Sequence, residues 1–212
     1  LNALSLTVSA VGTRLAYAAF TETSNVWSVP IPSGRVASVT QASPVTSGNQ
    51  VIELFDISPD GRWLAFDSDR SGNSDIYRMP LAGGDPQQLT RSPLNEFFPT
   101  WSPDGRELVF HGFRDGRRQI HTVSADGGPT VMVLESADQD QNAAWSKDGK
   151  TLYFLTNAGS PASVVRRVTR NQDGAWGPPE VWRRPGCRPD ESPTGDYAAC
   201  SQINGRSLLV RS

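Results

Sequence analysis

Short apolar segments recur along the chain, separated by turn-forming residues; they lie at 15–17, 63–66, 108–110 and 152–154. A second apolar segment follows each of them after a polar stretch, at 26–29, 76–79, 120–123 and 164–168. Short apolar runs bounded by Gly, Pro, Asn and Asp are typical of β-strands. No segment shows the apolar spacing of about 3.6 residues and the caps of an amphipathic helix. The pattern therefore predicts strands throughout and no helix.

A turn sequence repeats in step with these segments. The tetrapeptide Ser-Pro-Asp-Gly stands at 58–61 and 102–105, and variants of it stand at 9–12, 146–149 and 192–195. Proline presets φ, aspartate bonds to its own backbone, and glycine supplies a positive φ. We expect these aspartates to build a turn between the first and second strands of each unit, rather than to bind a metal or catalyse. Trp101 and Trp145 directly precede two of the turns and are expected to pack between neighbouring sheets.

The repeat predicts the fold class. Glycine pairs at 83–84 and 127–128 precede a last short segment in two units. Four short strands per unit of roughly 40–50 residues are typical of a β-propeller blade, because such a sheet buries its faces only against neighbours. We therefore predict an all-β protein, a β-propeller of four-stranded antiparallel blades, with about four full blades and a partial fifth. The expected blades span residues 4–46, 53–92, 97–138, 141–184 and, in part, 187–212.

The blade count leaves ring closure open. We expect a single propeller over residues 1–212 that forms the C-terminal part of a larger propeller. A five-bladed ring closed imperfectly and a ring completed by a second chain are the alternatives. An open blade edge would favour self-association.

Two segments resemble the TolB-type, WD-like propeller repeat. They are 57–77, ISPDGRWLAFDSDRSGNSDIY, and 98–110, FPTWSPDGRELVF. The copy that begins at Ser146 lacks the proline, and the first and last copies match weakly. The resemblance extends over nearly the whole chain. It is specific for fold and much less so for function, because one fold serves many functions.

The resemblance implies a non-catalytic platform that binds a protein or peptide, as a scaffold or sensor module of a larger bacterial protein. It also implies a periplasmic or otherwise exported location, with a cytoplasmic one left open. Similar repeats form the propeller of prolyl-oligopeptidase-type enzymes, so a gating propeller whose hydrolase domain lies outside this chain is the alternative. A weaker alternative is a carbohydrate-binding propeller, in which Trp176 and Trp182 would be stacking platforms instead of ordinary packing residues.

Charge and hydropathy exclude some partner classes. The formal net charge is −2 and the pI is about 5.7, so no positive field attracts nucleic acid. The chain has no apolar run of about 18 residues, and we expect no membrane insertion. Because Leu1 is not an initiator methionine, we expect the chain to be processed or to be cut from something longer.

The sequence carries no recognised catalytic motif. It lacks a Gly-x-Ser-x-Gly elbow, a P-loop, a dinucleotide fingerprint and a His-Glu-x-x-His pair, so we expect no enzyme activity and no cofactor. The histidines are His111 and His121, which we expect to pack or to face loops. Oxygen-bearing residues within 67–73 partly match a calcium loop, but Arg78 stands where that loop needs a bidentate glutamate. This segment therefore predicts a β-turn, and no metal site is expected.

The two cysteines flank the last turn. Cys187 and Cys200 are expected nearly opposite each other across the hairpin, within reach of a disulfide. A disulfide would favour an exported protein. Two free thiols are the alternative.

Propeller geometry gathers the candidate binding residues on one face. The N-terminal ends of first strands and the loops between second and third strands open on the same side. Around the channel mouth we expect Glu53, Glu96, Phe97, Asp140, Gln141 and Arg188. In an outer ring we expect Asp69, Arg70, Arg114 and Asp115. Mixed charges beside an exposed aromatic ring suit a peptide or protein partner, and an ordinary solvated rim is the alternative.

Overall fold

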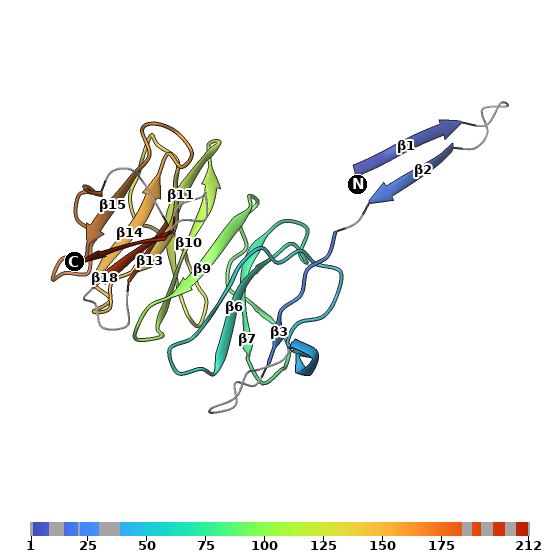
Figure 1. The fold of residues 1–212 in the computed structure, drawn as a ribbon, viewed down its shortest axis with the longest axis horizontal. Helices are drawn as coiled ribbons and strands as arrows, with labels where there is room; N and C mark the ends of the chain where they lie inside the picture. Colours follow the sequence, from blue (N-terminus) through green and yellow to red (C-terminus); the bar gives the residue numbers. More distant parts are fainter. Residues whose placement is uncertain are drawn as a thin grey trace. The chain divides into compact units, whose positions relative to one another are not determined.

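A computed structural model shows a chain of antiparallel β-sheets (Figure 1). The structure describes residues 2–8, 15–20, 22–29, 39–183, 188–191, 197–201 and 207–211. The chain divides into two compact units, Leu1–Val51 and Ile52–Ser212, and each is described separately. The described residues contain one short 3-10 helix, η1 (Val39–Gln41), and no α-helix.

The first unit holds two short strand pairs. Strand β1 (Asn2–Val8) pairs with β2 (Leu15–Phe20), and β3 (Trp27–Ser28) pairs with β4 (Ser43–Pro44). Val26 is buried here, and its N–H donates to Thr46 Oγ1 at 2.8 Å.

The second unit contains the predicted four-stranded sheets. The first consists of β5 (Phe55–Ile57), β6 (Trp63–Ser68), β7 (Asp75–Pro80) and β8 (Gln87–Gln88). The second consists of β9 (Glu96–Trp101), β10 (Glu107–Arg114), β11 (Arg117–Ser124) and β12 (Val131–Met132). The third consists of β13 (Asp140–Trp145), β14 (Thr151–Thr156), β15 (Val164–Thr169) and β16 (Glu180–Arg183). A three-stranded sheet follows, with β17 (Arg188–Glu191), β18 (Tyr197–Ser201) and β19 (Ser207–Arg211).

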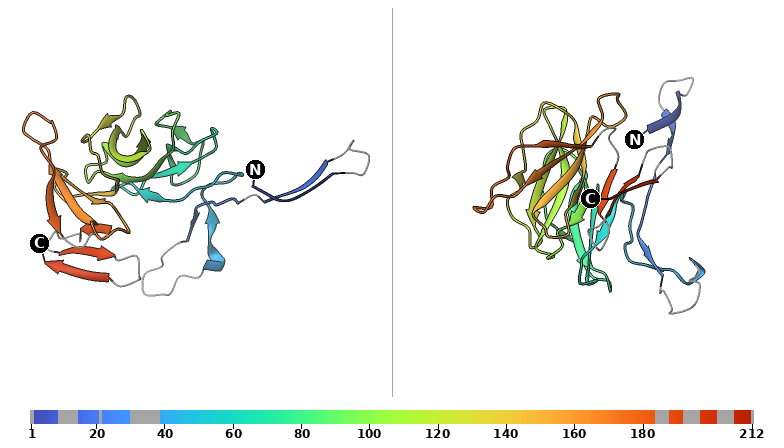
Figure 2. Two further views of the ribbon diagram at one scale, coloured as in Figure 1. Left: turned by 90° about the horizontal axis from the view of Figure 1, so that it is seen from above. Right: turned by 60° about the vertical axis from the view of Figure 1, so that its left-hand side comes forward.

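These sheets lie next to one another in chain order (Figure 2). The first strands contact one another in series, β5 with β9, β9 with β13, and β13 with β17. This arrangement confirms the predicted all-β fold of four-stranded antiparallel sheets. The number of blades in a closed ring stays a prediction.

The repeated tetrapeptide forms the same turn three times. Ser102 Oγ donates to Asp104 Oδ1 at 2.7 Å and accepts from the Glu107 N–H at 3.0 Å. The turns at 58–63 and 146–151 repeat both bonds. Gly105 has a φ of 69°, a left-handed conformation that favours glycine. The aspartates therefore build turns, as predicted.

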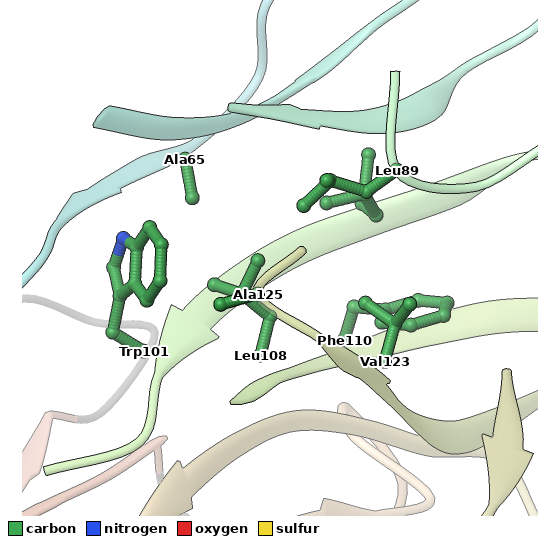
Figure 3. Close-up of a cluster of buried hydrophobic side chains, with 8 residues drawn as sticks. Ala65, Leu89, Trp101, Leu108, Phe110, Val123 and Ala125 are labelled. Atoms are coloured by element: carbon green, nitrogen blue, oxygen red, sulfur yellow. The ribbon is translucent and has the colours of Figure 1, made fainter. Parts of the chain in front are cut away.

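Apolar side chains of neighbouring sheets pack against each other. In the cluster of Figure 3, Ala65 and Leu89 from the first sheet meet Trp101 and Phe110 from the second. The next interface repeats the arrangement with Trp145. The prediction that both tryptophans pack between sheets is confirmed.

The structure also bears on the two other tryptophans singled out in the sequence and on the two cysteines. The ring centres of Trp176 and Trp145 are 6.0 Å apart, and those of Trp182 and Tyr153 are 4.9 Å apart, so both indoles pack against other aromatic rings.

The last hairpin contains one of the two cysteines in its described part. Cys200 of β18 pairs with Pro189 of β17. Cys187 lies outside the described residues, and the disulfide stays a prediction.

We expect Ser102→Ala to lower the stability of the chain. The substitution removes the acceptor of the Glu107 N–H and the donor to Asp104, which costs about 1 kcal/mol. Urea denaturation measures the effect, with the exposed Thr130→Ala as control. Equal stability of the two variants would contradict this role of the serine.

The two interface tryptophans allow a matched comparison. Trp145 Nε1 donates to the Thr100 carbonyl at 3.2 Å, whereas Trp101 Nε1 has no acceptor within the described residues. We therefore expect Trp145→Phe to cost about 1 kcal/mol more than Trp101→Phe, because only the first loses a hydrogen bond. Thermal unfolding of both variants tests this, and an equal or reversed order would refute it.

Candidate functional site

One edge of the second unit brings together most of the predicted residues. Phe97 pairs with His111 and Glu96 with Gly112, so the start of β9 lies beside the end of β10. The hairpin between β10 and β11 closes at the pair Arg114 and Arg117. Because the sheets repeat, the starts of β9 and β13 and the ends of β10 and β14 share this edge. We call it the mouth edge.

A β-bulge shapes the start of β9. Val109 pairs with Thr100 and His111 with Phe97, so Phe98 and Pro99 together face a single residue of β10. Phe98 has a φ of 63°, which is rare for a bulky side chain. As a result Phe97 and Phe98 are both half-buried, and the inside–outside alternation of the strand is broken.

The same bulge occurs in the next sheet. Gln141 pairs with Leu155 and Ala144 with Tyr153, and Asn142 at the bulge has a φ of 53°. Asparagine tolerates this conformation more readily than phenylalanine. The left-handed residue is thus a property of the repeated backbone, and Phe98 adopts it despite its size.

Asp67 fixes the bulge from the preceding sheet. Its buried carboxylate accepts the N–H groups of Glu53 at 2.7 Å, Leu54 at 3.2 Å and Phe98 at 3.1 Å. Burial raises the pKa of Asp67 to about 6, although these three hydrogen bonds oppose the shift. One side chain therefore ties the strand starts of two sheets together.

His111 occupies the corresponding place in the second sheet. Its ring lies 6.0 Å from the Phe97 ring and 5.1 Å from the Phe98 ring. Burial, and then the charge of Arg118, lowers the pKa of His111 to about 3, so the imidazole is neutral near pH 7. The histidine packs, as its sequence context predicted.

An aromatic cluster lies at the mouth edge beside a cation. Phe113 contacts Phe97 edge-on at 6.3 Å, and the Arg118 guanidinium lies 5.0 Å from the centre of the Phe113 ring. We call Phe97, Phe98, Phe113 and Arg118 the mouth cluster; all four are half-buried. Half-buried aromatic rings and arginine are the residues that dominate protein interfaces.

Two predicted contact residues lie beneath this surface. Glu96 is 6% exposed, its N–H donates to the Ser74 carbonyl at 2.7 Å, and its Oε2 has no partner within the described residues. Asp140 is fully buried and accepts from Thr156 Oγ1 at 2.6 Å. Both carboxylates are enclosed, whereas the sequence analysis placed them around the channel mouth as residues that contact a partner.

Burial raises the pKa of both carboxyls. For Glu96 the pKa rises to about 7, since desolvation and the charge of Asp75 outweigh the hydrogen bond from Thr90. For Asp140 desolvation again exceeds the effect of its hydrogen bonds. Glu96 thus carries less negative charge near neutral pH than an exposed glutamate does.

The other predicted residues differ in exposure. Exposed side chains are Glu53, Arg70, Arg114 and Asp115, and half-buried ones are Asp69, Phe97 and Gln141. Arg70 lies over the rings of Phe66 and Tyr77, at 5.3 and 5.1 Å from their centres. Arg114 and Asp115 are 4.0 Å apart. The side chain of Arg188 lies outside the described residues.

Sequence reasoning missed three members of the mouth cluster, Phe98, Phe113 and Arg118. Two signals were present in the chain. Consecutive phenylalanines at 97–98 break the alternation expected of a strand, and the turn at 114–118 reads Arg-Asp-Gly-Arg-Arg. The first signal indicates a bulge and the second a basic surface.

The opposite edge, where the Ser-x-Asp-Gly turns lie, differs between the two interfaces. Between the first and second sheets a groove of about 860 Å³ is lined by Trp63, Arg78 and Asp126 among others. At the next interface Arg170 pairs with Glu107 at 2.9 Å and lies 4.4 Å from the centre of the Trp176 ring. The indole of Trp176, from the loop after β15, thus packs against the second interface at this edge.

The described residues include no cluster of three or more His, Cys, Asp or Glu side chains arranged to hold a metal ion. In the same part of the chain, no helix has the length and apolar character required to cross a membrane.

Comparison with known proteins identifies relatives for most of the chain. Residues 2–181 match the profile of the TolB beta propeller domain. The solved structure of a putative TolB from Agrobacterium tumefaciens superposes with a TM-score of 0.70 at 25% identity, covering 92% of this chain and 68% of that one.

Two curated bacterial proteins match shorter stretches. An uncharacterized protein of Agrobacterium fabrum is 32% identical over 75 residues, which is 35% of this chain and 24% of that protein. The uncharacterized peptidase YuxL of Bacillus subtilis is 37% identical over 81 residues, 38% of this chain and 11% of the peptidase. The matched stretches are thus a small part of either relative.

Glu96→Gln is expected to stabilise the protein at pH 8 by roughly 1–3 kcal/mol, because it removes a buried charge whose Oε2 has no hydrogen-bond partner within the described residues. The folded-state pKa of about 7 lies above the ordinary value of 4.5, so the acid contributes most stability below pH 4.5 and loses it as the pH rises through 7. Urea denaturation between pH 4.5 and 8 measures this. The variant and the wild type should have similar free energies of unfolding at pH 4.5. If their free energies of unfolding changed in parallel with pH, burial of the Glu96 charge would not explain the effect.

Proposed function

Because the chain belongs to the TolB beta-propeller family, we propose that it is a non-catalytic scaffold or sensor module that binds a protein or peptide at the mouth edge. The observation that carries the proposal is the mouth cluster of Phe97, Phe98, Phe113 and Arg118. Aromatic rings and arginine are enriched at protein interfaces, since the rings bury a large apolar area with few rotatable bonds and the guanidinium presents five hydrogen-bond donors.

The rigidity of the mouth edge supports this proposal. Phe98 keeps a φ of 63°, and Asp67 accepts its N–H at 3.1 Å from the neighbouring sheet. A strained residue persists only where its surroundings fix it. A preorganised surface loses less entropy when a partner binds. The buried Glu96 and Asp140 support the surface from below in this proposal, and Gln141 borders it.

The exposed residues named from the sequence complete the proposed surface. Arg114 and Asp115 lie on the hairpin next to the cluster. Just before β5 stands Glu53, and just after β6 stand Asp69 and Arg70. Their mixed charges would steer and orient a partner more than they strengthen its binding. An exported, periplasmic location belongs to the same proposal and rests on the family resemblance alone.

A gating propeller of a peptidase is the second candidate, and the match to the peptidase YuxL favours it. This candidate places a hydrolase domain elsewhere in the full-length protein. Cleavage of a proline-containing peptide by that protein, blocked by a fluorophosphonate, would support it. We do not propose carbohydrate binding, because Trp176 and Trp182 pack against Trp145 and Tyr153.

The test selects random peptides from a display library on the 212-residue chain and titrates the strongest binders against variants. Phe98→Asn removes the ring and keeps the bulge, as Asn142 already does in the next sheet. We expect Phe98→Asn and Phe113→Ser each to weaken binding by about tenfold or more. The control is Arg62→Ser, an exposed residue of the opposite edge, which should leave the affinity unchanged.

Two results would refute this function. One is a set of peptides that bind all variants equally, which would place their site elsewhere. The other is a library that yields no binder at all. Circular dichroism of each variant verifies that the sheets remain folded.

A further inference from the structure

A small polar pocket opens at the mouth edge between the second and third sheets. It has a volume of about 220 Å³ and is lined by Arg118, Gln139, Gln141, Asn157, Ala158 and Ser160. They come from β11, from β13 and the residue just before it, and from the turn after β14. The pocket lies beside the mouth cluster, because Arg118 belongs to both.

Three of the lining side chains are engaged in the walls. Gln139 accepts the Arg118 N–H at 3.0 Å and donates to the Gly116 carbonyl at 3.4 Å. Asn157 accepts the Gln139 N–H at 3.1 Å and donates to Asp138 at 2.9 Å. Ser160 Oγ donates to the Asn157 carbonyl at 2.9 Å. These bonds fix the shape of the pocket and leave the engaged groups little capacity for a ligand.

Two polar groups that line the pocket are not engaged in its walls, the Arg118 guanidinium and the Gln141 carboxamide. Within the described part of the chain neither has a hydrogen-bond or ion-pair partner, and both are half-buried. The guanidinium is held in place by the face of Phe113, at 5.0 Å. Partial burial of a cation without a counter-ion costs free energy that a bound anion would recover.

The charges around the pocket favour an anion. The hairpin supplies Arg114, Arg117 and Arg118 against one acid, Asp115, which lies 4.0 Å from Arg114. Asp138, which accepts a hydrogen bond from the pocket residue Asn157, is already paired with Arg166 at 2.9 Å. The local excess is therefore positive, although the chain as a whole has a net charge of −2.

We propose that this pocket receives the side-chain carboxylate of an acidic residue in the bound protein, with Arg118 and Gln141 donating hydrogen bonds to it. A planar guanidinium and a carboxamide are well suited to a carboxylate. The adjacent rings of Phe97 and Phe113 would take up an apolar or aromatic neighbour of that residue. This inference rests on the proposed function and narrows its partner to segments that join an apolar residue to Asp or Glu.

The experiment uses capped dipeptides as probes, so that it does not depend on any selected binder. Acetyl-Phe-Glu-amide is titrated into the full chain, with acetyl-Phe-Gln-amide as the neutral match and acetyl-Phe-Gly with a free C-terminus as the second carboxylate source. The readout is the shift of the Arg118 side-chain N–H and Gln141 carboxamide signals in NMR spectra. We expect only the Glu probe to move them strongly, with at least fivefold tighter binding than the Gln probe.

Arg118→Gln and Arg117→Gln form a matched pair of variants. They remove the same charge from neighbouring positions, but Arg117 is exposed and does not line the pocket. We expect Arg118→Gln to weaken binding of the Glu probe at least fivefold and to leave binding of the Gln probe unchanged. Arg117→Gln should weaken the Glu probe by less than twofold.

Several outcomes would overturn the inference. They are equal binding of the Glu and Gln probes, no shift with the Glu probe, tighter binding of the free C-terminus, and equal effects of the two variants. Failure of the proposed function is separate, because it appears as selected peptides that ignore Phe98→Asn. Peptides that need Phe98 but contain no acidic residue would uphold the function and refute the carboxylate pocket.

Discussion

The packing of each sheet against the next is the interaction on which the rest of the second unit depends. A four-stranded sheet has two faces, and a single sheet leaves at least one of them in water. Ala65 and Leu89 on one sheet are buried by Trp101 and Phe110 on the next, and the following interface repeats this with Trp145. Turns and bulges lie toward the two edges, and the polar groups within the interfaces are hydrogen-bonded, as Trp145 Nε1 is to the Thr100 carbonyl.

One position at the mouth edge carries a different side chain in each sheet. Asp67 joins two sheets through three backbone hydrogen bonds, His111 fills the same place with ring contacts, and Leu155 is buried without any polar contact. The bulge recurs in β13, so the repeated backbone does not require a carboxylate at this position. The side chain at this position can differ from sheet to sheet while the sheets still pack together. The mouth cluster lies beside the copy occupied by His111.

The sequence predicted the strands, the turns and the interface tryptophans, because each follows from local patterns that repeat. It did not predict the burial of Glu96 and Asp140. Their burial depends on how the start of each first strand packs against the neighbouring sheet, which residue spacing does not show. Arg118 was missed for a related reason, since only the folded hairpin shows that its guanidinium lies over Phe113 beside a pocket.

At the turn edge the two interfaces are closed by ion pairs that differ in their exposure to solvent. At the turn edge the second and third sheets are clamped by Arg170, which pairs with Glu107 and covers Trp176. The first and second sheets have an open groove there, bridged by Arg78 and a largely exposed Asp126. Exposed ion pairs are screened by water and salt more than half-buried ones, so the Arg78–Asp126 pair contributes less to its interface than the Arg170–Glu107 pair does. The turn edge of the first interface is therefore held mainly by its apolar cluster, whereas that of the second interface is held also by an ion pair partly shielded from water.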